Sequence, residues 1–140
     1  MPRHFAWVSD PTRGGTKITP QVKRETEQRI RTFAAKHFKG KYTRLDIRFR
    51  GHFCYVDAYQ KPGLPKRLPK DWHETREEMR ERLRNTPTRL CRLRYRYGDQ
   101  WGLALFLYSS ERYETSVYHS GEFTGTPEEA FELAASFHLQ

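Results

Sequence analysis

The sequence predicts a single α+β domain: a mainly antiparallel sheet of about five strands, two helices packed on one of its faces, and a third helix at the surface. Segments in which apolar and polar residues alternate indicate half-buried strands, and apolar residues at three- and four-residue spacing indicate helices. The order helix, two strands, helix, three strands, helix is typical of an antiparallel sheet with helices packed on it. A chain of 140 residues has room for one compact domain.

The chain begins with an irregular arm, residues 1–18, and the α+β domain is expected to span residues 19–140. The arm mixes polar residues with prolines and glycines. Within it, Phe5, Trp7 and Val8 alternate weakly and are candidates for an additional edge strand.

The first helix and the first hairpin have clear signals. Thr19–Pro20 places an N-cap residue before a helix-starting proline, and apolar spacing continues the helix to near Phe38. Two alternating segments, residues 44–50 and 53–59, then predict neighbouring strands, because Gly51 interrupts the pattern between them.

The middle of the chain predicts an exposed loop followed by a surface helix. Three prolines among four basic residues in 60–70 exclude this stretch from a strand ladder. Asp71 or Thr75 can cap the helix that follows, since each has a Glu three residues later. The helix runs to about Arg84, and its narrow apolar stripe places it at the surface.

The last third of the chain predicts three strands and a closing helix. Residues 91–96 alternate, residues 101–108 are strongly apolar and therefore central, and residues 113–118 form a fifth strand. Thr126 then starts a helix with an N-cap, a helix-starting proline and a capping-box Glu.

Three segments resemble a set of small uncharacterised prokaryotic proteins: RFRGHFCYVDAY, TRLCRLRYRY and SGEFTGTPEEAFELAA. The similarity covers most of the chain from Thr43 onward. It implies a compact, self-contained unit and brings no activity, cofactor or binding residue with it.

Composition indicates a folded and basic protein. The chain contains 3 Trp, 8 Tyr and 9 Phe, more large rings than a disordered chain carries. Lys and Arg number 26 against 17 Asp and Glu, which gives a formal net charge of +9. A field of that sign attracts polyanions, of which nucleic acid is the commonest in a cell. An Arg-rich composition also suits a thermophilic source, so charge alone does not decide function.

The sequence carries no signal for a membrane, a metal or a cofactor. No apolar run approaches the roughly 18 residues that span a bilayer, and residues 1–10 lack the apolar core of a signal peptide. We therefore expect a cytoplasmic protein without a membrane partner. Cys54 and Cys91 lie in apolar runs without zinc-finger spacing, so we expect buried, reduced thiols. No Gly-rich phosphate loop is present.

Strand alternation divides the side chains between two faces of the sheet. An apolar set should face the two long helices: Leu45, Ile47, Phe49, Cys54, Val56, Cys91 and Leu93. The opposite face then carries arginines interleaved with aromatic rings, and its candidate nucleic-acid-binding residues are Arg44, Arg48, Arg50, Tyr55, Tyr59, Arg92, Arg94 and Arg96. Guanidinium groups pair with phosphates, and bases stack on rings at about 1–3 kcal/mol each. The leading hypothesis is a module that binds single-stranded nucleic acid or RNA.

Other interpretations of this face remain open. Tyr and Arg can pack flat on each other in a solvated surface, or the middle helix can cover the rings. The face can also serve a protein partner or a homodimer, because Tyr and Arg are enriched in interface cores. A small metal-independent ribonuclease with His52 or His119 as general acid or base is a further alternative. No residue set defines a catalytic site, so we favour a binding protein over an enzyme.

The register of the first hairpin decides where two carboxylates lie. A type I′ turn at Arg50–Gly51 sets Arg44 opposite Asp57, which gives an ordinary salt bridge. A type II′ turn at Gly51–His52 instead sets Asp46 opposite Asp57, a pair able to hold Mg²⁺. Opposed like charges cost stability unless neighbouring arginines compensate, so the first register is favoured.

The turn after Tyr97 decides which residues of the central strand face outward. A two-residue turn would expose Trp101, Leu103 and Leu105 and lose apolar burial. We therefore expect a three-residue turn, with an outward set of Gly102, Ala104, Phe106 and Tyr108.

Overall fold

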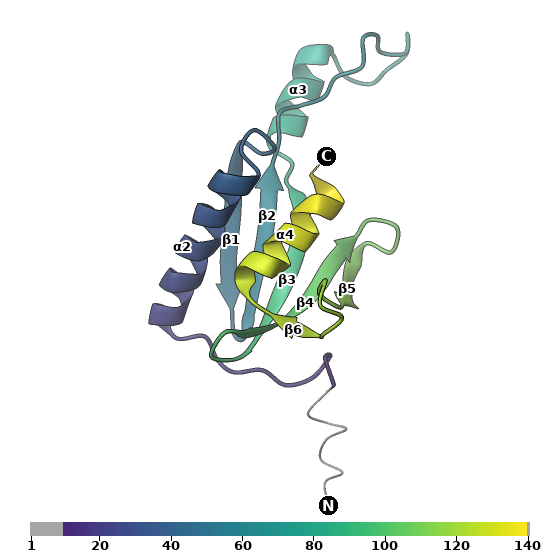
Figure 1. The fold of residues 1–140 in the computed structure, drawn as a ribbon. Helices are drawn as coiled ribbons and strands as arrows, with labels where there is room; N and C mark the ends of the chain where they lie inside the picture. The colour runs from purple at the N-terminus through teal and green to yellow at the C-terminus, as the bar shows by residue number, and fades with distance from the viewer. Residues whose placement is uncertain (1–9, 140) are drawn as a thin grey trace, which may run out of the picture.

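Six antiparallel strands form one open sheet in the computed structural model, which describes residues 10–139 (Figure 1). The strands are β1 Arg44–Arg50, β2 Phe53–Tyr59, β3 Thr88–Tyr97, β4 Gln100–Leu107, β5 Arg112–Ser116 and β6 Thr124–Gly125. Strands β1 to β5 lie side by side in chain order, and β6 pairs with β4. The predicted α+β class and antiparallel sheet are confirmed. The short β6 lies between the predicted fifth strand and the predicted closing helix, where the sequence analysis predicted no strand.

Two helices cover one face of this sheet. Helix α2 (Pro20–His37) lies over β1, helix α4 (Pro127–His138) lies over β3 and β4, and the two helices pack on each other. Helix α3 (Arg76–Arg84) and the loop before it project beyond the end of the sheet in Figure 1, and α3 contributes no buried residue. This helix therefore does not cover the opposite face of the sheet, which we call the open face.

N-capping threonines set the starts of the helices. Thr75 and Glu78 form a capping box at α3, so Thr75 is the cap and the alternative, Asp71, is not. Thr126 and Glu129 form the same reciprocal arrangement at α4. Each box satisfies two backbone N–H groups that have no partner within the helix.

The core lies between the helices and the covered face of the sheet. Its largest members, Trp101 and Phe131, are 1% exposed. Phe38 contacts Phe131 edge-on, with ring centroids 5.6 Å apart. Cys54 and Cys91 are free and fully buried, as predicted. Burial raises the pKa of Cys91 to about 12, so its thiol stays protonated at neutral pH.

The register predicted for the β1–β2 hairpin is wrong. Asp46 pairs with Asp57 across the two strands, and Gly51 has a φ of 63°, as the first central position of a type II′ turn requires. The like charges are tolerated because Arg48 bridges them: its Nη1 donates to Oδ2 of Asp46 at 2.7 Å and to Oδ2 of Asp57 at 2.9 Å. The guanidinium provides the compensation on which this register depends.

The turn between β3 and β4 also differs from the prediction. Tyr97 pairs with Gln100, which leaves the two-residue turn Gly98–Asp99, and the pairing shifts by one residue at Arg96. This β-bulge restores the alternation that a two-residue turn would otherwise have reversed. Trp101 is therefore buried, and the predicted outward set is correct although the predicted turn length is not.

Candidate nucleic-acid interface

Arginines and aromatic rings alternate across the open face. Strand pairing places on this face seven of the eight predicted site residues: Arg44, Arg48, Arg50, Tyr55, Tyr59, Arg92 and Arg94. The eighth, Arg96, lies at the bulge where β3 ends. The apolar residues predicted for the other face are buried or half-buried there. The predicted division of side chains between the two faces is thus confirmed.

Several of the guanidinium groups lie over aromatic rings. The Cζ atom of Arg44 is 3.8 Å from the centroid of Tyr59. Arg92 lies between two rings, 4.5 Å from Phe53 and 5.4 Å from Tyr113. A guanidinium that lies over an aromatic ring keeps N–H donors with which it can bind an anion.

One arginine of this face is neutralised by the chain itself. Arg48 bridges the two opposed carboxylates of Asp46 and Asp57. Asp57 is buried, whereas Asp46 is not. Burial lowers the pKa of Arg48, but the hydrogen bonds to Asp57 and Asp46 outweigh this effect and the pKa ends above its usual value. Arg48 is therefore a fixed structural cation rather than an available one.

Two further arginines hold the segment that leads into α2. Arg94 donates from Nη1 to the carbonyl oxygen of Gly14 at 2.7 Å. Arg96 donates from Nη1 to the carbonyl of Arg13 and from Nη2 to that of Asp10, the latter at 3.1 Å. Through these bonds, the described part of the predicted arm lies at the border of the open face. This part of the arm contains no helix or strand. The edge strand predicted around Trp7 lies outside the described residues.

The remaining arginines of the open face lack a carboxylate partner. Within residues 10–139, no Asp or Glu oxygen lies within 4.0 Å of the guanidinium nitrogens of Arg44, Arg50, Arg89 and Arg92. Most arginines elsewhere are paired. On the helix side, for example, Arg29 binds Asp99 and Glu128, each at 2.6 Å.

Arg89 is a site residue that the sequence analysis missed. A second bulge shifts the β2–β3 pairing, so that Val56 pairs with Cys91 and Asp57 with Arg89. Leu90 and Cys91 are consequently both fully buried, and Arg89 moves to the open face, 5.4 Å from the centroid of Phe106. Two adjacent apolar residues within an alternating strand are the signal that would have indicated this bulge.

Tyr113 is a second missed residue. It was placed on a strand but not at the site, yet β5 brings its ring 5.7 Å from Tyr55 and 5.1 Å from Phe106. Burial, followed by the charge of Asp57, raises the pKa of Tyr113 to about 12. The ring therefore stays neutral and joins the aromatic surface between the arginines.

The two histidines considered for catalysis occupy different surroundings. The His52 ring stacks on Phe53 at 4.3 Å, and burial, followed by the charge of Arg94, lowers its pKa. His119 is exposed after β5. Among residues 10–139, no group of three or more His, Cys, Asp and Glu side chains is placed to hold a metal ion. None of the described helices has the length and apolar character needed to cross a membrane.

No family model, curated protein or solved structure matches this chain. Function is therefore inferred from the open face itself. Its distinguishing property is a group of unpaired arginines held on aromatic rings, on the side of the sheet that the helices leave uncovered.

Proposed function

We propose that this protein binds single-stranded nucleic acid on the open face of its sheet. The observation that carries the proposal is the set of arginines without carboxylate partners, Arg44, Arg50, Arg89 and Arg92, on a face that α2, α3 and α4 leave open. A folded chain normally neutralises or disperses such charge. Here the compensating anion is proposed to be the phosphate backbone.

The arrangement supports contacts to both parts of a nucleotide. Arg44 and Arg92 lie over rings and have no carboxylate partner within residues 10–139, so their N–H donors can form charge-assisted hydrogen bonds to phosphate oxygens. Tyr55 and Tyr59 are only half-buried, and we propose that bases stack on Tyr55 and on the part of the Tyr59 ring that Arg44 leaves uncovered. Base faces are accessible in a single strand and hidden in a duplex, which is why a single strand is the proposed ligand.

Binding to a fluorescein-labelled single strand, followed by anisotropy over a series of salt concentrations, tests the proposal. With four phosphate contacts, log K should fall with log [salt] with a slope of about −3. Arg92→Gln should weaken binding and reduce the magnitude of this slope by about 0.7. Arg24→Gln removes an exposed, unpaired arginine from α2 and should leave the slope nearly unchanged.

Two results would contradict the proposal. Binding that is absent, or equally sensitive to Arg24→Gln and Arg92→Gln, would show that the open face is not the binding surface. A stable dimer in sedimentation experiments that dissociates on Tyr55→Asp would instead assign the face to contact between two copies of the chain.

A further inference from the structure

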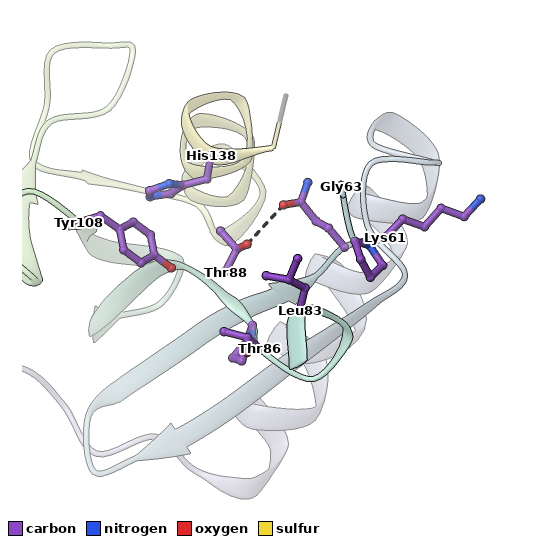
Figure 2. Close-up of a pocket in the computed structure, with 10 residues that line it drawn as sticks. Lys61, Gly63, Leu83, Thr86, Thr88, Tyr108 and His138 are labelled. Carbon is purple, nitrogen blue, oxygen red and sulfur yellow. Dashed lines mark hydrogen bonds between the residues drawn. The ribbon is translucent and has the colours of Figure 1, made fainter. Parts of the chain in front are cut away.

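A separate cleft lies at the end of the sheet, between the last turn of α4 and the projecting α3. It has a volume of about 540 Å³ and is formed by the start of the loop after β2, the C-terminal end of α3, the start of β3, the end of β4 and the last turn of α4 (Figure 2). That volume is within the range of clefts that bind small organic ligands. None of the sequence signals pointed to it.

The charge of the cleft selects the class of ligand. Lys61 lines it, and no Asp or Glu does. His138 contributes no charge at neutral pH, because burial lowers its pKa. One side is the ring of Tyr108, which is 51% exposed. Lys61 and the exposed ring of Tyr108 lie on opposite sides of the cleft (Figure 2). A cation and an aromatic ring that face the same cleft, with no opposing anion, suit a ligand that is both planar and negatively charged.

The polar groups of the cleft are held in fixed positions. Thr88 donates from Oγ1 to Oε1 of Gln60 at 3.3 Å, and Gln60 donates from Nε2 to the carbonyl oxygen of Lys41 at 3.2 Å (Figure 2 shows the first bond). The hydroxyl of Tyr108 accepts from the backbone N–H of Arg89 at 2.8 Å, which leaves its own proton to donate. An oriented amide and a hydroxyl donor can bind the polar edge of a nucleobase.

A chain of side-chain contacts links the cleft to the open face through Phe106, which is itself buried. The guanidinium of Arg89 lies 5.4 Å from the centroid of Phe106, and the Phe106 ring contacts that of Tyr108 at 4.8 Å. Tyr108 therefore belongs to both surfaces: its ring ends the aromatic row of the open face and forms one wall of the cleft. A chain of nucleotides on the open face would reach the cleft at this end of the sheet.

We propose that the cleft binds one nucleotide, with the base against Tyr108 and the phosphate at Lys61, and that in the complex this is the terminal nucleotide of the strand on the open face. The first half stands on the cleft alone, and the second rests on the proposed function. A free mononucleotide and the end of a strand share this chemistry, and the experiment separates them.

The test is a titration of the ¹⁵N-labelled full chain, followed by backbone amide chemical shifts. Uridine 5′-monophosphate, adenosine 5′-monophosphate and a short single strand are added in separate experiments. Gly63→Trp is designed to fill the cleft. A Cβ on Gly63 would meet no heavy atom within 4 Å, so the position has room for a side chain to begin. Thr32→Trp places the same side chain on the exposed surface of α2 as a matched control.

We expect a mononucleotide to shift the amides of Lys61, Gly63 and Thr88. Gly63→Trp should weaken mononucleotide binding at least about tenfold and strand binding about three- to tenfold, because most strand contacts lie elsewhere. Thr32→Trp should change neither. Arg92→Gln should weaken strand binding and leave mononucleotide binding intact.

The two proposals fail in different ways. If the strand shifts open-face amides but neither ligand shifts the cleft amides, the nucleotide cleft is wrong and the open-face proposal stands. If the mononucleotide occupies the cleft but no strand binds, the cleft is a free-nucleotide site and the open-face proposal is wrong. If Gly63→Trp leaves every affinity unchanged, the cleft proposal is overturned.

Discussion

The two faces of the sheet are built from the same strands, yet their side chains have different surroundings. On the face under α2 and α4, residues such as Trp101 and Leu93 are nearly inaccessible, and the chain supplies every contact they need. On the open face, rings are half-buried under arginines, and several guanidinium groups have no carboxylate partner among the residues that the structure describes. The covered face is complete within the chain, whereas the open face has charge that an external anion can neutralise.

The comparison teaches that the two faces contribute unequally to the stability of the fold. Apolar burial at about 25 cal/mol per Å² holds the fold together, and it acts almost entirely on the covered side. Cation–π contacts at exposed sites contribute only about 0.5–1 kcal/mol each. Substitutions on the covered face should therefore change stability, and substitutions on the open face should change binding.

The largest expected effect is on stability and comes from the covered face. Phe131→Ala removes a ring that is 1% exposed, and it should lower the free energy of unfolding by about 3–5 kcal/mol. Phe137, on the same helix, is 52% exposed, so Phe137→Ala should cost less than about 1 kcal/mol. Urea denaturation followed by circular dichroism measures both. Equal losses would contradict the assignment of the core.

The second-largest expected effect is the loss of stability on replacing a strand glycine. Gly125 lies on the covered side of the sheet and Gly102 on the open side. A Cβ on Gly125 would lie 2.6 Å from the Tyr118 ring, so Gly125→Ala should destabilise the protein by about 1–3 kcal/mol. On the open side, a Cβ on Gly102 would make an ordinary contact of 3.5 Å with Arg94. Gly102→Ala should therefore stay within about 1 kcal/mol of the parent. Thermal denaturation of the two variants makes the comparison, and a larger loss at Gly102 would contradict it.

Asp57→Asn tests whether the positive charge of the open face contributes to binding. The substitution removes one of the two carboxylates that offset positive charge on the open face, while Asp46 remains to pair with Arg48. Affinity for a single strand should rise about twofold, as about 0.5 kcal/mol of relieved repulsion implies. Anisotropy titration at low salt measures the change. Weaker binding by a variant that is still folded would contradict the proposed path of the strand.

The smallest expected effect is a pH dependence. His52 lies at the hairpin turn of the open face and His138 at the end of α4, and burial lowers the pKa of each below 6.5. The unfolded chain takes up protons at these sites first as the pH falls, so stability present above pH 6.5 decreases as the pH drops through the folded-state pKa values. Urea midpoints at pH 7.5 and 5.0 measure it, and His138→Gln should reduce the difference. An increase in stability toward pH 5.0 attributable to these residues would contradict the assignment.

Most of the fold follows from local patterns. Alternation in β1 and β2 and the Thr126–Pro127 start of α4 depend on neighbouring residues only, and the structure has them where they were expected. The bulge at Leu90 left a signal in the two adjacent apolar residues Leu90 and Cys91, but the bulge at Arg96 left none, because there the alternation continues and only the pairing across strands shifts.

The position of the candidate site could be predicted from the sequence. Which of its arginines are bound by other groups of the chain could not. Alternation placed the arginines on one face, but whether each is free depends on contacts far apart in sequence. Arg48 donates a hydrogen bond to Asp57 on the next strand, and Arg94 donates one to the carbonyl oxygen of Gly14 in the segment before α2. Neither contact leaves a periodic signal, so the sequence alone could not separate them from Arg44 and Arg92.

Cross-linking of a bound strand tests the central claim most directly. A single strand carrying 4-thiouridine would be irradiated in complex with the full chain, and the linked peptides identified by mass spectrometry. We predict links within β2, β3 and β5, at or beside Tyr55, Arg92 and Tyr113, and few from α2 or α4. Links concentrated on those two helices, with none on the open face, would contradict the account.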